Sequence, residues 1–455
     1  MASRLDTDVA VVGTGVVGTA IARDLSRYDL RVTLVDAAFD VGAGTSKANT
    51  ALLHTGFDAT PGSLEAGLVA RGYDLLSEYA PRVGIPVERT GALLVAWNEE
   101  QVAEFPGIVE RSRANGYEAI AEIGRDELYR REPNLGPGAQ GALEVPDESI
   151  ICPFTTPLAF ATEAVLAGCE LRLGETVTAA ERLDGGGFGV TTPQGGLSAR
   201  FLVNAAGLFA DEIDRMLGYD RFTITPRRGE LVVFDKLARP LVRQIVLAVP
   251  TKVTKGVLIA PTVFGNVMLG PTAEDMERKD DRGSSATGLA YLRREGERIM
   301  PTLLEHEITA VYAGLRAASE RSDYQLSTDD GYACVGGIRS TGLTASMAIA
   351  EHVRAELARD GLRLEPREEL PELRMPNLGE AFPRPYQQAD LIERDPEYGR
   401  VVCFCERVTG GEIRDALASP IPPRDLDGLR RRTRAHLGRC QGFYCGAQLQ
   451  ALLES

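Results

Sequence analysis

The 455-residue sequence has little of what would mark a secreted, membrane-spanning or nucleic-acid-binding protein. It contains one tryptophan and seven cysteines, and no apolar run approaches the roughly 20 residues of a transmembrane helix. The apolar stretch that begins at Val9 is too short for a signal peptide and runs into glycines, so it predicts a strand. The formal charge of −15 argues against nucleic acid or an anionic membrane as a partner. We therefore expect a cytoplasmic protein of about three domains.

Four of the seven cysteines lie near the C-terminus in two pairs. One residue separates Cys403 from Cys405, four separate Cys440 from Cys445, and 34 lie between the pairs. Paired cysteines in such a chain more often bind a metal than form disulfides. Four thiolates suit zinc or an iron–sulfur cluster, and the C-x-C pair is unusual for zinc. The remaining cysteines are scattered and are expected to be small buried residues.

Residues 8–36 have the pattern strand, glycine turn, helix, strand. The first apolar run leads into Gly13, Gly15 and Gly18, spaced as G-x-G-x-x-G, and the second ends at Asp36. Such glycines allow a tight turn and close approach to a pyrophosphate, which rests on the helix N-terminus, while the acid hydrogen-bonds a ribose. This pattern predicts an α/β fold with a Rossmann-like dinucleotide-binding domain.

Two later glycine turns favour FAD over NAD as the dinucleotide. A predicted strand ends in N-A-A-G at Gly207, and G-G-I-R-S-T-G from Gly336 precedes a predicted helix from Met347 to Ala358. A helix N-terminus with glycines beside it can face an electron-rich flavin ring. FAD is long enough to need three turns spread from Gly13 to Gly342, whereas a simple NAD domain would not need the last one.

Several further motifs follow one another along the chain. They are T-S-K-A-N-T-A-L-L-H-T-G-F-D from Thr45, T-P-R-R-G-E from Thr225, P-T-K-V-T-K-G from Pro250, G-P-T from Gly270, A-G-L-R from Ala313 and G-I-R-S-T-G-L-T-A-S from Gly337. In this order they resemble the FAD-dependent glycerol-3-phosphate dehydrogenases of the anaerobic type, whose D-amino-acid-oxidase-like fold also includes glycerol-3-phosphate oxidases and L-2-hydroxyglutarate dehydrogenases. One departure is that relatives often read N-S-G-I-V-H-A-G where this chain reads N-T-A-L-L-H-T-G.

The C-terminal cysteine arrangement resembles the bacterioferritin-associated-ferredoxin-like domain, which holds a 2Fe–2S cluster. The resemblance implies that the cluster ligands are Cys403, Cys405, Cys440 and Cys445. For FAD, the glycine turns and the resemblance together predict contacts with Gly13, Gly15, Gly18, Asp36, Thr45, Ser46, Asn49, Thr50, Val177, Ala206, Gly207, Gly337, Gly342, Leu343 and Thr344.

His54 is the predicted catalytic residue, because the resemblance places it beside the flavin and an imidazole can take a hydroxyl proton near neutral pH. A hydrogen-bonded core histidine is the alternative. The resemblance also implies that Lys255 and Arg316 bind the anionic end of the substrate, with Ser340 and Thr341 hydrogen-bonding that group or the flavin. Arg316 could instead form an ion pair with Glu320. For Arg227 and Arg228, a structural role in a loop is favoured.

The predicted architecture has three parts. Residues 1–362 form the FAD-dependent oxidoreductase, with an antiparallel-sheet substrate domain inserted at roughly 81–145 and 216–314. A proline-rich linker spans 363–399, and a small helical iron–sulfur domain spans 400–455. The basic run from Arg430 to Arg434 predicts a solvated helix face or a docking patch that offsets the charge of the cluster.

These features predict oxidation of sn-glycerol 3-phosphate to dihydroxyacetone phosphate by hydride transfer to FAD. Electrons would leave through the 2Fe–2S cluster to an acceptor subunit or quinone-linked carrier, with peripheral membrane association through that partner. The alternatives are an L-2-hydroxyglutarate or other 2-hydroxy-acid dehydrogenase or oxidase, an opine or amine oxidase subunit, and a non-catalytic electron-relay subunit. Retention of His54, Lys255 and Arg316 speaks against the last of these.

Overall fold

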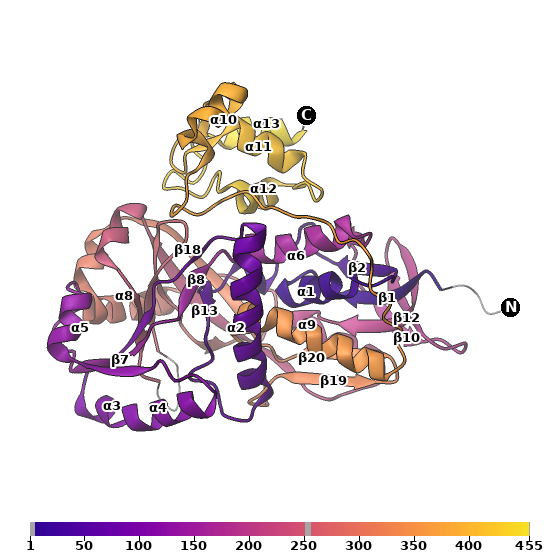
Figure 1. Cartoon of the computed structure of the whole chain (residues 1–455), viewed down its shortest axis with the longest axis horizontal. Helices are drawn as coiled ribbons and strands as arrows, with labels where there is room; N and C mark the ends of the chain where they lie inside the picture. Colours follow the sequence, from indigo (N-terminus) through magenta and orange to yellow (C-terminus); the bar gives the residue numbers. More distant parts are fainter. Residues whose placement is uncertain (1–4, 251–255, 455) are drawn as a thin grey trace.

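The computed structural model describes residues 5–250 and 256–454. Lys255, one of the predicted substrate-binding residues, lies outside the described residues. A large body contains two extended sheets, and a small C-terminal domain sits on one side of it (Figure 1). A long segment leaves the body after α9 (Gly342–Arg359) and runs along its surface to the small domain (Figure 1).

The first sheet carries the predicted dinucleotide turn. Strands β12, β1, β2 and β9 lie side by side and parallel, and β20 pairs with the end of β12, also parallel. Its strands are β1 (Thr7–Val12), β2 (Val32–Asp36), β9 (Glu170–Leu173), β10 (Ala179–Arg182), β11 (Phe188–Thr192), β12 (Gly195–Asn204), β19 (Gln325–Asp329) and β20 (Tyr332–Gly336). Because both faces of β1 are covered, Val9, Ala10 and Val11 are fully buried, as expected for a central parallel strand.

Helices cover the parallel strands. Helix α1 (Val16–Leu25) packs against both α9 and α6 (Thr155–Leu166), and α2 (Leu64–Val83) packs on α9. The start of α2 is stabilised by the Ser63 hydroxyl, which accepts a hydrogen bond from the Ala66 amide. It ends at Gly84, whose left-handed conformation suits a glycine C-cap.

The second sheet is mixed, whereas the sequence predicted an antiparallel one. Its order is β17-β13-β16-β15-β14-β5-β7-β6, with β18 paired to β13. The pair β5–β14 is parallel, with Ala92 opposite Ile245, and the other pairs are antiparallel. These two strands belong to separate stretches of the chain, so no hairpin imposes opposite directions on them.

The strands of this second sheet are β5 (Ala92–Ala96), β6 (Ala121–Gly124), β7 (Gly141–Val145), β13 (Ile224–Phe234), β14 (Ile245–Ala248), β15 (Leu258–Pro261), β16 (Val267–Gly270), β17 (Glu274–Asp275) and β18 (Ile308–Ser319). A small sheet of β3 (Leu52–Leu53), β8 (Ser149–Ile151) and β4 (Val87–Glu88) completes the body. The remaining α-helices of the body are α3 (Glu99–Ala103), α4 (Phe105–Ala114), α5 (Arg125–Arg131), α7 (Ala210–Met216) and α8 (Ala286–Ile299).

The C-terminal domain has a small core of its own, made mainly by Val408, Ile413, Leu429 and Leu449. Its elements are β21 (Val401–Cys403), β22 (Val408–Thr409), α11 (Gly410–Leu417), α12 (Leu426–Thr433) and α13 (Gly446–Glu454). The preceding segment contains α10 (Ala389–Arg394) and follows the body closely: the Arg367 guanidinium donates to three backbone carbonyls of residues 26–30.

The basic run on α12 is not a solvated face. Arg431, Arg432 and Arg434 are each less than a tenth exposed, because this side of the domain rests on the body. Asp40 of the body accepts hydrogen bonds from Arg431 and Arg432, so these charges form a contact within the chain. The solvated-helix prediction was wrong for these three arginines, since sequence alone cannot show which helix face meets another domain.

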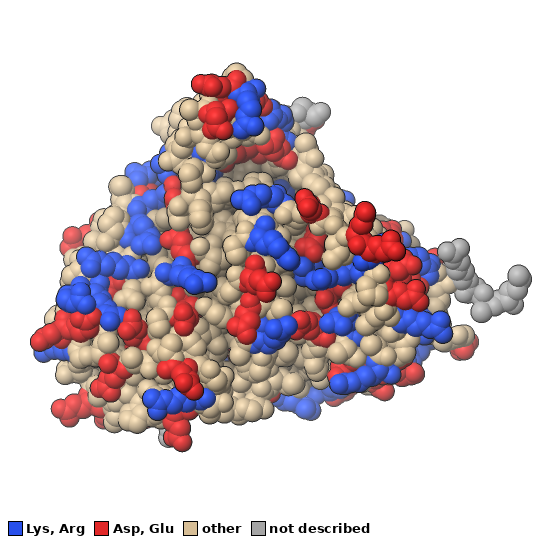
Figure 2. Space-filling view, in the orientation of Figure 1, with Lys and Arg blue, Asp and Glu red and all other residues tan. Residues whose placement is uncertain are grey.

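Among the described residues, no helix is long and apolar enough to cross a membrane. Acidic and basic side chains are interspersed over the face shown in Figure 2, without a large area of one sign.

Candidate active site and cluster site

A cavity of about 860 Å³ lies between the two sheets of the body. Its walls include residues of the dinucleotide turn, the segment 43–58, the turn at 205–209 and strands of the second sheet. Of the predicted site residues, it is lined by Gly13, Gly15, Asp36, Thr45, Ser46, Asn49, Thr50, His54, Ala206, Gly207, Arg316, Ser340, Thr341, Gly342 and Leu343. Segments from the whole length of the body therefore meet at one cavity.

The three glycines of the first turn have different surroundings. A Cβ on Gly13, whose φ is +110°, would lie 2.3 Å from the Ala205 carbonyl oxygen, and one on Gly18 would lie 1.9 Å from the Gly13 carbonyl oxygen. At Gly15, the nearest atom to a Cβ is Ser46 Oγ at 3.4 Å, and the residue faces the cavity. Gly13 and Gly18 thus permit close packing of the chain, while Gly15 leaves room for a ligand.

Asp36 ends β2 at the cavity, and its carboxylate is already oriented by the turn. Its Oδ2 accepts hydrogen bonds from the amide and hydroxyl of Thr14, at 2.5 and 2.7 Å, and its Oδ1 accepts one from the Ala38 amide. The carboxylate is therefore held at the edge of the site where a ribose of a dinucleotide would lie.

The segment 45–50 lies across the start of α1. Ser46 Oγ accepts a hydrogen bond from the Val16 amide at 2.9 Å, and the Thr45 hydroxyl donates to the Leu315 carbonyl. Asn49 closes the segment on itself through the Ser46 carbonyl and the Ala51 amide. These contacts join the first sheet to β18 and present the segment to the cavity.

A second helix N-terminus reaches the same cavity. Gly342 begins α9, and Thr341 at its N-cap makes no side-chain capping bond. Together with the start of α1, this places amide-rich ends of two helices at one site, which favours electron-rich and anionic groups.

Four of the predicted FAD contacts do not line the cavity: Gly18, Val177, Gly337 and Thr344. Gly18 packs against Gly13, Gly337 turns the chain with a φ of +64°, and Val177 packs on the core of the first sheet. Thr344 is fully buried, and its hydroxyl accepts a hydrogen bond from the His54 amide at 3.0 Å. These residues lie behind the cavity wall in this structure.

His54 lines the cavity and is held by a residue that sequence reasoning missed. Its Nδ1 lies 3.0 Å from Oε2 of Glu148, which is fully buried. The other oxygen of Glu148 accepts from the amide and hydroxyl of Thr55. Glu148 lies 94 residues from His54 in the chain, and no local pattern marks it; pairing of β3 with β8 brings the two together.

Arg316, on β18, lines the cavity and has no acidic partner in the part of the chain that the structure describes. Its Nη2 donates to the Thr272 carbonyl at 3.3 Å, and among the described residues no carboxylate lies within ion-pair distance of its guanidinium. The alternative pairing with Glu320 is not formed, since that carboxylate accepts from the Thr223 amide. Burial, reinforced by the neighbouring charge of Arg227, lowers the pKa of Arg316 to about 10. An anion in the cavity would relieve both effects.

The other polar residues predicted near the substrate differ in their availability. Ser340 is exposed and lines the cavity, whereas the Thr341 hydroxyl is engaged with Glu65 and Tyr324. Arg227 and Arg228 lie on β13 and not in a loop, because they continue the long pairing of that strand with β18. Their guanidinium groups pair with Asp275 and Glu274.

The four C-terminal cysteines approach one another as two pairs. Cys440 lies close enough to Cys405, and Cys403 to Cys445, to influence the pKa of the neighbouring thiol. Burial raises the pKa of the Cys445 thiol to about 12, with Cys403 adding to the effect. Burial acts in the same direction on Cys440, but the amides of residues 442–444 point at its sulfur and lower its pKa overall. Amide donors around sulfur are what a thiolate-bound cluster requires.

The two pairs also differ in exposure. Cys403 and Cys445 are buried, while Cys405 and Cys440 are partly exposed. Among the described residues, no three histidine, cysteine or acidic side chains already stand at metal-binding geometry, so the fit to a cluster rests on the paired thiols and their amide donors. Three strongly exposed aromatic residues occupy the same two loops: Phe404, Phe443 and Tyr444.

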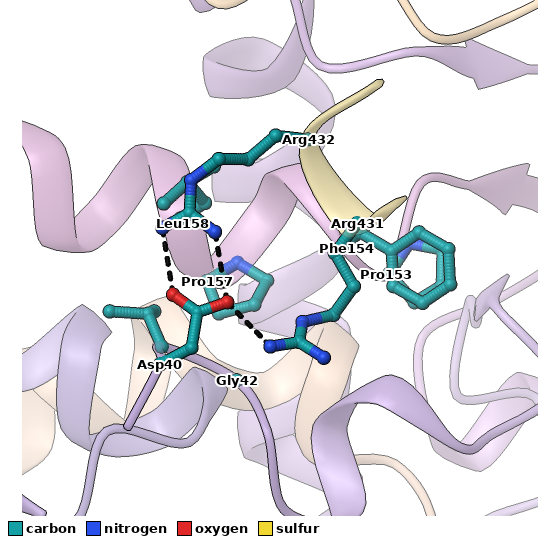
Figure 3. Close-up of a pocket in the computed structure, with 9 residues that line it drawn as sticks. Asp40, Gly42, Pro153, Phe154, Pro157, Leu158, Arg431 and Arg432 are labelled. Atoms are coloured by element: carbon teal, nitrogen blue, oxygen red, sulfur yellow. Dashed lines mark hydrogen bonds and ion pairs between the residues drawn. The ribbon is translucent and has the colours of Figure 1, made fainter. Parts of the chain in front are cut away.

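The interdomain interface lies beneath α12 (Figure 3). Asp40 points between Arg431 and Arg432, and its oxygens accept from both guanidinium groups at 2.5 to 2.8 Å. Burial acts to raise the pKa of Asp40, but these arginines outweigh it and lower the pKa below its ordinary value. Arg434 lies over the Phe264 ring at 4.1 Å and donates to Glu406.

The interface borders the cavity. Lys47, which lines the cavity, lies 3.9 Å from Asp427 of α12, and Asp40 lies in the loop that follows Asp36 at the end of β2. The pKa of Lys47 is lowered, first by burial and then by Arg431. The small domain is thus docked against the segment that carries the dinucleotide turn.

Comparison with known proteins agrees with this geometry. Residues 8–356 match the family model described as FAD dependent oxidoreductase, and residues 401–455 match the BFD-like [2Fe-2S] binding domain. The fold and the two sites therefore define a flavin-dependent oxidoreductase with an iron–sulfur domain, and FAD and a 2Fe–2S cluster are its cofactors. Open space at Gly15, two helix N-termini and the paired thiols fit these groups.

The relatives narrow the class further. The chain is 33% identical over 451 residues to the glycerol 3-phosphate dehydrogenase of Caloramator mitchellensis, covering 98% of this chain and 93% of that one. It is 26% identical to one subunit of the anaerobic glycerol-3-phosphate dehydrogenase of Escherichia coli K12, covering 98% and 88%. The solved L-alpha-glycerophosphate oxidase of Mycoplasma pneumoniae with FAD bound matches with a TM-score of 0.77 and 29% identity, covering 81% and 98%. The chain belongs to the FAD-dependent oxidoreductase family that includes these enzymes.

Proposed function

We propose that the chain oxidises sn-glycerol 3-phosphate to dihydroxyacetone phosphate. The observation that carries this proposal is Arg316, a partly buried guanidinium without a carboxylate partner among the described residues, in the same cavity as His54. A phosphate monoester would supply the missing negative charge, and the planar guanidinium can bind two of its oxygens. Lys255 and Ser340 are proposed to bind the same group.

His54 is the proposed base. When FAD is bound, it accepts the hydride of the carbinol carbon. The hydroxyl proton moves to Nε2 of His54, because Nδ1 faces Glu148. Loss of a hydride and a proton together converts the secondary alcohol to the ketone. The His54 side chain is partly buried, and the backbone amide of His54 donates to the Thr344 hydroxyl. This hydrogen bond fixes the backbone that carries the imidazole ring.

The proposed electron route leads from the flavin through the 2Fe–2S cluster to an electron-acceptor protein or a quinone-linked carrier. Cys405 and Cys440 are the cysteines that reach the surface, beside Phe404, Phe443 and Tyr444, so electrons are proposed to leave at this end of the domain. The Escherichia coli relative is named as one subunit of its enzyme, which supports the existence of partner subunits.

Anaerobic bleaching of the oxidised-flavin absorbance tests the substrate. We expect glycerol 3-phosphate to reduce the flavin faster than L-2-hydroxyglutarate, lactate or an opine at equal concentration. His54→Ala should slow this reduction by about two to four orders of magnitude, with normal FAD content. His306→Ala is the control, because His306 lies outside the cavity wall. Faster reduction by another compound in the panel would reject the proposed substrate, and an unimpaired His54→Ala enzyme would reject the proposed base.

A further inference from the structure

Glu148 is a buried carboxylate in contact with His54 but outside the cavity wall. It stands immediately before β8, which pairs antiparallel with β3 so that Leu53 lies opposite Ser149. Extending this register by one residue beyond the paired strands would set His54 opposite Glu148. The pairing of β3 with β8 therefore brings the two side chains close together.

The two oxygens of Glu148 differ: Oε1 has hydrogen-bond donors, whereas Oε2 accepts no hydrogen bond from the described residues. Oε1 accepts hydrogen bonds from the Thr55 amide at 2.8 Å and the Thr55 hydroxyl at 2.9 Å, and Oε2 lies 3.0 Å from Nδ1 of His54. Glu148 is fully buried. A buried carboxylate oxygen needs a donor, and a proton on Nδ1 of His54, 3.0 Å away, would supply the one that Oε2 lacks.

We propose that Glu148 is a positioning residue that holds His54 in the Nδ1–H tautomer, so that Nε2 is the nitrogen that accepts the substrate proton. A carboxylate behind an imidazole fixes its tautomer and orientation, and it stabilises the imidazolium that forms as the proton arrives. This inference rests on the proposed function, because it takes His54 as the proton acceptor.

Two other acidic residues, Glu65 and Asp147, have partners of their own. Glu65 lines the cavity but accepts from Thr341 and pairs with Arg339. Asp147, the neighbour of Glu148, accepts from the Tyr117 hydroxyl. Among the described residues, Glu148 lies within ion-pair distance of the His54 ring.

The two hydrogen bonds from Thr55 determine which atom of the residue at position 148 faces His54. The Thr55 amide and hydroxyl both donate to Oε1 of Glu148, so both require an oxygen acceptor there. In Glu148→Gln, the amide oxygen would be retained by these two donors, so the amide NH₂ would face His54 Nδ1. An NH₂ group donates, which would force His54 into the Nε2–H tautomer.

Nitrogen NMR of the ¹⁵N-histidine-labelled holoenzyme tests the tautomer directly, and the chain has only four histidines. We expect His54, assigned by loss of its signals in His54→Ala, to carry its proton on Nδ1 in the wild type and on Nε2 in Glu148→Gln. Glu148→Asp keeps a carboxylate and should keep the wild-type tautomer. Glu144→Gln is a matched control on β7, where the side chain pairs with Arg131. A wild-type His54 protonated on Nε2 would overturn the proposal.

Flavin reduction by glycerol 3-phosphate provides the second readout. Glu148→Gln should lower the reduction rate at saturating substrate by at least about 100-fold with little change in the half-saturating concentration, and Glu148→Asp should recover part of it. If His54→Ala is slow while Glu148→Gln reacts like the wild type, the positioning role is rejected and the base is retained. If glycerol 3-phosphate does not reduce the wild-type flavin, the proposed function fails, and the NMR result still decides the tautomer.

Discussion

At the dinucleotide turn beside the cavity, backbone segments pack directly against one another, whereas buried ion pairs hold the interdomain interface under α12 together. A Cβ at Gly13 or Gly18 would overlap a carbonyl oxygen, so the dinucleotide turn depends on the absence of side chains. At the interface, the guanidinium groups of Arg431 and Arg432 donate to the carboxylate of Asp40, so the contact depends on these paired charges. Steric fit therefore governs the first region and electrostatics the second, and different changes should disable each.

The largest effect on turnover should come from filling the space at Gly15. Gly15→Ala adds a Cβ that meets only Ser46 Oγ at 3.4 Å, so the chain should fold while the new methyl group occupies ligand space. We expect FAD affinity to fall by about two orders of magnitude, measured by flavin release and fluorescence titration of the apoprotein.

Gly107→Ala on α4 is the matched control, because a Cβ there meets nothing within 4 Å; its FAD content should be normal. Gly13→Ala should fail at an earlier step, since its Cβ would overlap the Ala205 carbonyl and its φ is +110°. Unchanged FAD affinity in Gly15→Ala would show that steric fit does not govern this region.

The next largest effect should be loss of the iron–sulfur cluster with retention of FAD. Cys440→Ser removes one of the partly exposed thiols from the cluster site. We expect iron and labile sulfide to be lost and electron delivery to an acceptor to stop, while substrate still reduces the flavin, because the FAD cavity is built by other segments. Cys169→Ala, in the body, should retain iron. A Cys440→Ser protein that loses FAD would show that the small domain supports the cavity.

The smallest effect on turnover should come from the interface. Asp40→Asn leaves Arg431 and Arg432 buried beside a neutral group, so we expect docking of the small domain to weaken by about 3 kcal/mol. The measurement is the rate of electron transfer from reduced flavin to the cluster, with protease sensitivity of residues 363–399 as a structural readout. Asp427→Asn, an exposed acid on α12, should cost about 1 kcal/mol or less.

The pH dependence of docking gives a second test of the contact between Asp40 and the arginines of α12. The folded-state pKa of Asp40 is lowered from its ordinary value of 3.8, so its contribution is fully present above that value and is lost as pH falls through the lowered pKa. Docking should therefore be constant across neutral pH and weaken only in strong acid. Weakening between pH values of about 5 and 7 would point to another group.

Sequence reasoning was strongest where the chemistry is local. The glycine spacing and the terminal acid of β2 lie within 24 residues, from Gly13 to Asp36, and the cavity contains both ends of that motif. It was weaker for pairs that meet through tertiary contacts: the ion pair of Arg316 with Glu320 does not form, and the arginines of α12 are buried. Helical spacing suggested the Glu320 pair as an alternative for Arg316, but Arg316 lies on strand β18. The prediction of a solvated face was wrong for the α12 arginines because the small domain docks on the body.

The sequence by itself determined the class of protein, because the dinucleotide turn and the cysteine pairs each need closely spaced residues whose chemistry is set by short-range geometry. Only the tertiary structure decided that Glu148 supports His54, that Arg316 faces the cavity without a carboxylate among the described residues, and that Asp40 receives the arginines of α12. The physical reason is that each of these depends on which surfaces bury each other, and burial determines whether a charge needs a partner and which group can supply it.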